Sequence, residues 1–100
     1  MKRVDRIREM ENCLDVSAEA LGKLSSAAEA YEAALPFMKK LSAYYGSAQW
    51  RRDLEADEAG RLPKELKRGV LSEDAVWDLL SENRELCERL AALIEENARL

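Results

Sequence analysis

The sequence predicts an all-α protein: an antiparallel helical hairpin or small bundle of two long helices, with a cap of short helices between them. Three observations support this. Charged residues make up 36% of the chain and aromatic residues only 6%, and Ala, Leu, Glu and Arg, which lose little side-chain freedom in a helix, dominate. Apolar residues recur every seven positions in 2–45 and again in 72–99. Between them, residues 44–74 hold three of the four glycines and one of the two prolines.

The first long helix is expected over about 2–45. Its apolar stripe is wider than a two-column coiled-coil seam, because a third column of mostly small residues flanks two larger ones. Pro36 removes one backbone hydrogen bond, so the helix should either kink or break there. The first column is Ile7, Leu14, Leu21, Ala28, Leu35 and Ser42; the second is Met10, Ser17, Leu24, Tyr31, Met38 and Tyr45; the third is Cys13, Ala20, Ala27, Ala34 and Leu41.

The cap is expected over 46–71. Gly46 can end the first helix, and Ser47 can cap a short helix from about Ala48 to Ala59 that Gly60 closes. Pro63 suits the first turn of another short helix, over 64–68, closed by a further glycine. An apolar face should join this cap to the helix pair, made of Trp50, Leu54, Leu62, Leu66, Val70 and Leu71, with Tyr44, Tyr45 and Trp77 beside it.

The returning helix is expected over 72–99, with Ser72 as its N-cap and acidic residues in its first turn. Four leucines recur at spacing seven, as in a leucine zipper. A DNA-binding zipper needs a basic helix running directly into it, whereas Leu-Ser-Glu-Asp precedes this one. Packing against the first helix is therefore favoured. The leucines are Leu79, Leu86, Leu93 and Leu100, and the companion column is Val76, Asn83, Leu90 and Asn97.

Charge and hydropathy narrow the classes of partner. The net charge is −4, and the acidity is concentrated in 73–100, which carries eight anions and three cations. Nucleic-acid and anionic-membrane partners need clustered cations, so neither is expected. The first nine residues are charged throughout and lack the apolar core of a signal peptide, and no apolar run approaches the ~20 residues of a spanning helix. Cys13 and Cys87 are expected to be buried thiols in a reducing cytoplasm.

The chain shows little sign of catalytic chemistry. It has no histidine, which removes the usual general base and the usual zinc ligand. We therefore expect no catalytic residues, no cofactor and no enzymatic activity. The alternative is a divalent-cation enzyme or metal-binding protein, although neighbouring arginines could instead pair with the acids it would use. The candidate ligands form one central acidic run: Asp53, Glu55, Asp57 and Glu58.

A block of residues in the middle of the chain resembles a known family signature. The block reads Tyr44-Tyr45-Gly46-Ser47, Trp50, Asp53, Glu55, Asp57-Glu58-Ala59-Gly60, Leu62-Pro63 and Leu66-Lys67-Arg68-Gly69-Val70-Leu71-Ser72-Glu73-Asp74. It resembles the signature of a small bacterial all-helical family catalogued as a domain of unknown function. The resemblance extends across nearly the whole chain. It implies a bacterial, intracellular, single-domain helical protein and supplies no activity. The length of a hundred residues likewise predicts one domain, 1–100.

The residues themselves favour a non-enzymatic intracellular interaction or scaffold module. In the expected hairpin the first helix is the longer one, so about the first 16 residues project beyond the returning helix. Exposed apolar stripes of this kind mark interfaces. We expect a homodimer and an unknown protein partner, while a break at Pro36 leaves a compact monomer possible. The expected interaction residues are Val4, Ile7, Met10 and Leu14 in the first helix, and Tyr44, Tyr45 and Trp50 near the cap.

Overall fold

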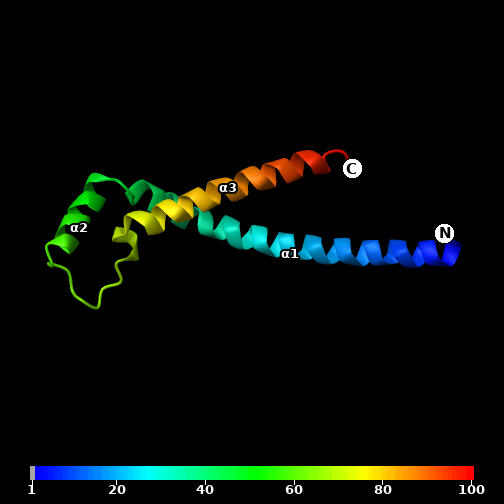
Figure 1. Cartoon of the computed structure of the whole chain (residues 1–100), viewed down its shortest axis with the longest axis horizontal. Helices are drawn as coiled ribbons and strands as arrows, with labels where there is room; N and C mark the ends of the chain where they lie inside the picture. The colour runs from blue at the N-terminus through cyan, green and yellow to red at the C-terminus, as the bar shows by residue number, and fades with distance from the viewer. Residues whose placement is uncertain (1) are drawn as a thin grey trace. The chain divides into compact units, whose positions relative to one another are not determined.

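The computed structural model describes residues 2–100. Those residues form α1 (Arg3–Tyr44), α2 (Ala48–Glu58), the 3-10 helix η1 (Gly69–Leu71) and α3 (Glu73–Asn97), without any strand (Figure 1). The prediction of an all-α protein is confirmed. The long helix expected over 2–45 corresponds to α1, and the returning helix expected over 72–99 corresponds to α3.

The chain divides into two compact units. The N-terminal unit ends at Phe37, and the C-terminal unit is Met38–Leu100. The division falls inside α1, next to Pro36, but α1 continues through that proline as one helix. Proline removes only one intrahelical hydrogen bond, here the bond to the carbonyl of Glu32. The good helix formers on either side can sustain the helix across that gap.

The N-terminal unit consists of α1 residues with little burial. Every residue from 2 to 30 is exposed, and the partly buried positions begin at Tyr31. The helix in this stretch is supported by helix propensity and by local pairs such as Lys23 Nζ with Glu19 Oε1, 3.1 Å apart. Its apolar columns therefore contribute nothing to a core within this unit.

The C-terminal unit holds the buried apolar residues of the described chain, namely Trp50, Leu71 and Val76. Ser47 caps α2, because its hydroxyl accepts a hydrogen bond from the Trp50 amide at 3.1 Å. Glycines stand on both sides of α2 with left-handed backbone, Gly46 at φ 78° and Gly60 at φ 71°. A residue with a side chain would be strained in that backbone conformation. The two glycines therefore fix where the chain turns.

The prediction of a short helix over 64–68 is wrong. Pro63 instead starts a single turn in which the Leu66 amide donates to the Pro63 carbonyl at 3.2 Å, and the next regular element is η1. Five residues would give barely one helical turn, and a first turn is costly to nucleate without packing to support it. Most residues of 61–70 are exposed, so that packing is lacking.

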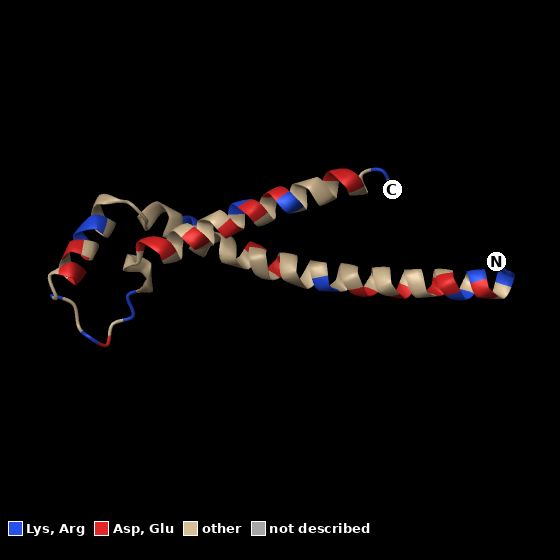
Figure 2. Cartoon of the chain, in the orientation of Figure 1, with Lys and Arg blue, Asp and Glu red and all other residues tan. Residues whose placement is uncertain are grey.

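The start of α3 agrees with its sequence signals. The Ser72 hydroxyl accepts a hydrogen bond from the Ala75 amide at 3.4 Å, and Glu73 and Asp74 occupy the first turn. The anions stabilise the positive end of the helix dipole. Acidic residues recur along the whole of α3 (Figure 2). Across residues 2–100, each helix is too short or too polar to cross a bilayer.

Candidate functional site

The centre of the C-terminal unit is Trp50, whose side chain is only 7% exposed. Its indole Nε1–H donates a hydrogen bond to the Val70 carbonyl at 2.9 Å, which ties α2 to η1. The ring of Tyr45 meets the indole edge to face, with centroids 5.2 Å apart and planes inclined by 65°. Trp50 was predicted as an interaction residue, but the structure places it inside the cap, where its contacts are internal.

Two tyrosines join the end of α1 to α2 and to the start of α3. The Tyr44 hydroxyl donates to Asp53 Oδ2 at 2.6 Å, and the Tyr45 hydroxyl donates to the Glu73 carbonyl at 3.0 Å. The hydrogen bond to Asp53, with desolvation and the nearby negative charge, raises the pKa of Tyr44 to about 12. Both predicted interaction tyrosines are half-buried, and their hydroxyls serve to hold this unit together.

The central acids lie on α2, and two of them have partners within the protein. Asp53 accepts from Tyr44 and also from Gln49 Nε2 at 3.3 Å. Asp57 pairs with Arg68 Nη1 at 2.7 Å, which connects α2 to the segment before η1. Within residues 2–100, histidine, cysteine and acidic side chains nowhere gather in threes that could hold a metal ion. The other two candidates, Glu55 and Glu58, are exposed.

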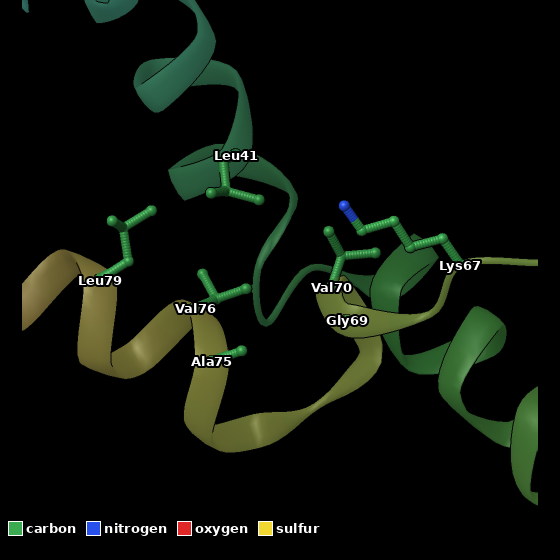
Figure 3. Close-up of a pocket in the computed structure, with 7 residues that line it drawn as sticks. All are labelled: Leu41, Lys67, Gly69, Val70, Ala75, Val76 and Leu79. Atoms are coloured by element: carbon green, nitrogen blue, oxygen red, sulfur yellow. The ribbon is translucent and has the colours of Figure 1, made fainter.

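An open apolar pocket of about 400 Å³ lies where the last turns of α1 meet η1 and α3. Leu41 faces Val76 and Leu79 across it, and the Lys67 side chain extends alongside Val70 at its rim (Figure 3). The lining contains no acid, thiol or hydroxyl that could serve as base or nucleophile. What the pocket offers is apolar contact with one cation at its edge. The remaining lining residues are Gly69 and Ala75.

A second feature is the exposed apolar face of the N-terminal unit, which we call the α1 stripe. Its members are between about half and two-thirds exposed: Ile7 is 52% exposed and Leu14 62%. Monomeric proteins rarely leave a long contiguous apolar surface in water. The α1 stripe comprises Val4, Ile7, Met10, Leu14, Leu21 and Leu24.

Three features differ from the sequence-based expectations. Trp77, expected to join the cap, is 59% exposed. Cys13 and Cys87, expected to be buried, are exposed on the surface. Each cysteine lies on an apolar helical column. Such a column is buried only where another element covers it. The role of Lys67 at the pocket rim was not foreseen, because an isolated lysine in a loop gives no sequence signal.

These observations define a small all-helical protein with a hydrogen-bonded aromatic cap and an exposed apolar helix face. The sequence matches the family described as "Domain of unknown function (DUF4298)" over residues 7–93, and the chain belongs to that family. The expectation of a family of unknown function is thereby confirmed, while the signature residues remain a prediction. Comparison with curated proteins found no match, and comparison with solved structures found none either.

Proposed function

We propose that this protein is a non-enzymatic, cytoplasmic interaction module that binds helical partners through the α1 stripe, beginning with a second copy of itself. The observation that carries the proposal is the exposure of apolar residues at helical spacing from Val4 to Leu24. Covering such a stripe with a partner helix removes apolar surface from water, which is the main driving force of helix association. A further protein partner would use the same mode of recognition.

The C-terminal unit acts in this proposal as a folded anchor. The side chains of four of its residues donate hydrogen bonds to partners within the unit: Tyr44, Tyr45, Trp50 and Arg68. The hairpin belongs to the proposal as well: α3 returns along the end of α1. A hollow lined by Ser42 together with Leu80, Cys87 and Ala91 supports this arrangement inside the C-terminal unit.

We propose no catalytic role. Two of the four acids of the metal-dependent alternative, Asp53 and Asp57, already have a phenol and a guanidinium as partners. A cation at this place would have to displace both. The internal role of these acids supports the interaction module over the alternative.

The proposal predicts that the protein is a dimer. Light scattering at high micromolar concentration should give about twice the chain mass of 11.3 kDa. The double variant Ile7→Asp with Leu14→Asp should return the mass to that of one chain, because two charges in the paired stripe lose their hydration without a partner.

The matched control is Val16→Asp. Val16 is 58% exposed on the same helix but lies outside the three heptad columns, so this variant should remain dimeric. A monomeric mass for the unmutated protein contradicts the proposal. An equal loss of dimer in Val16→Asp would show that the added charge, and not the stripe, is responsible.

A further inference from the structure

Along the α1 stripe, from Val4 to Leu24, two opposite charges occupy positions that flank the apolar seam. With Ile7 at position a and Met10 at position d, Arg6 takes position g and Glu11 takes position e. These flanking positions are where paired helices exchange ion pairs, and the ion pairs set which partner binds and in which direction.

Neither charge has an ion-pair partner among residues 2–100 of its own chain. Arg6 and Glu11 are five residues apart on one helix, and only residues three or four apart face each other there. In residues 2–100 the side-chain ion pairs are Lys23 with Glu19 and Asp57 with Arg68, and neither includes Arg6 or Glu11. Both residues are exposed, beside the half-exposed apolar seam.

We infer that α1 binds a second copy of α1 in parallel and in register, through the α1 stripe and two reciprocal ion pairs from Arg6 to Glu11 of the second copy. A separation of five residues, from g to the following e, is the spacing at which parallel helices bring side chains together across the seam. The inference rests on the proposed function, because it specifies the geometry of the dimer proposed there.

Along the α1 stripe the other flanking positions carry no charge that could compete with this choice of direction. From residue 13 to residue 27 they are all small and uncharged. The charged flanking residues Glu32 and Lys39 lie beyond the C-terminal end of the stripe. An antiparallel pairing places e opposite e and g opposite g, so Arg6 and Glu11 would lie on different sides of the seam. Only the parallel, in-register pairing lets both charges of each chain find an opposite charge. The neutral flanking residues are Cys13, Ala18, Ala20, Ser25 and Ala27.

The test mixes two charge-reversed variants, Arg6→Glu and Glu11→Arg. Each variant alone should dimerise roughly tenfold more weakly than the unmutated protein at low salt, because two exposed attractions become two repulsions. An equimolar mixture should form the 1:1 heterodimer in preference to either homodimer, since both pairs then have opposite charges again. Native mass spectrometry distinguishes the three species when one chain carries an isotope label.

The matched control mixes Arg8→Glu with Glu9→Arg, which make the same charge changes on the outer face of the helix. This mixture should give the statistical proportion of heterodimer. If the mixture of Arg6→Glu with Glu11→Arg also gave statistical proportions while each variant remained dimeric, the parallel pairing would be overturned. The proposal of a dimer would be unaffected. A monomeric unmutated protein would instead overturn the proposed function, and this inference with it.

A second measurement does not depend on charge. Spin labels can be placed on outer-face cysteines introduced one at a time at Asp5, Glu19 or Ala33, after Cys13→Ser and Cys87→Ser. Parallel pairing in register predicts the same label-to-label distance at all three positions. Antiparallel pairing predicts distances that change along the helix, since 14 residues of helix span about 21 Å. Unequal distances would overturn the inference.

Discussion

Several side chains in the C-terminal unit form hydrogen bonds within that unit. Two of these bonds could not be predicted from the sequence, because their acceptors are backbone carbonyls. Tyr45 and Trp50 both donate to backbone carbonyls, those of Glu73 and Val70. A carbonyl belongs to every residue, so no residue type in the sequence reveals which one will accept. The pairing of Asp57 with Arg68 was easier to expect, because opposite charges near one another in sequence are ready partners.

The Tyr44–Asp53 hydrogen bond predicts a dependence of stability on alkaline pH. In the unfolded chain a tyrosine loses its proton near its ordinary pKa of about 10. In the folded protein the pKa of Tyr44 is raised to about 12, so the folded state retains the proton over that interval. The contribution of Tyr44 to the free energy of unfolding is therefore complete below pH ~10 and is lost as the pH rises to about 12.

The variant Tyr44→Phe should show a smaller fall in the free energy of unfolding between these two pH values, measured by denaturant titration. Asp53→Asn should behave in the same way, because it keeps the phenol and removes the charge that holds its proton. An undiminished fall in both variants would show that Tyr44 does not titrate with the raised pKa.

At the scale of elements, the helices could be predicted from local signals, and the connecting segment could not. Serine caps and glycine stops act within a few residues, so Ser47, Gly46 and Gly60 mark the ends of their helices by themselves. The segment from 61 to 68 is mostly exposed, and its ion pair to α2 is made by its last residue, Arg68, with Asp57. The helix expected over 64–68 did not form, because five residues make barely one turn and little packing supports that turn.

Two glycines in different backbone conformations give a pair of opposite predictions. Gly60 has φ 71°, so Gly60→Ala should lower the free energy of unfolding by about 1 kcal/mol through backbone strain, although the added methyl group meets no neighbour. Gly22 lies inside α1 with open space around it, so Gly22→Ala should stabilise the helix by about 1 kcal/mol.

Circular dichroism during thermal unfolding checks both. A higher helix content at intermediate temperature is expected for Gly22→Ala, and a lower midpoint for Gly60→Ala. Shifts of the same sign would mean that backbone conformation does not determine whether alanine stabilises or destabilises the protein at Gly22 and Gly60.

At the scale of the whole molecule, the sequence predicted helical class and an apolar stripe, but periodicity cannot say what covers a stripe. The columns through Cys13 and Cys87 have the same spacing as columns that pack inside a protein. Burial depends on the length and position of neighbouring elements, which the spacing of residues within one helix does not encode. The expectation that the cysteines are buried was wrong for this reason.

The proposed dimer predicts that amide hydrogen exchange responds to concentration in one unit only. Residues 2–30 are exposed in the single chain, so their helix should open easily in a dilute sample and gain protection as dimers form. Amides around Trp50 should exchange at a rate independent of concentration, because their partners lie within the same chain. Protection of residues 2–30 that stays constant from low to high micromolar concentration would contradict the dimer.

The uniform exposure of residues 2–30 also bears on how this protein tolerates mutation. In a selection that reports only whether one chain folds, substitutions at Ile7 or Leu14 remove no buried contact and should pass almost unnoticed. In a selection that reports assembly, variants with substitutions at Ile7, Leu14 and the other positions of that column, seven residues apart, should be lost. Tolerance maps from the two selections would then diverge in α1 and coincide around Trp50, so the difference between them would trace the binding face residue by residue.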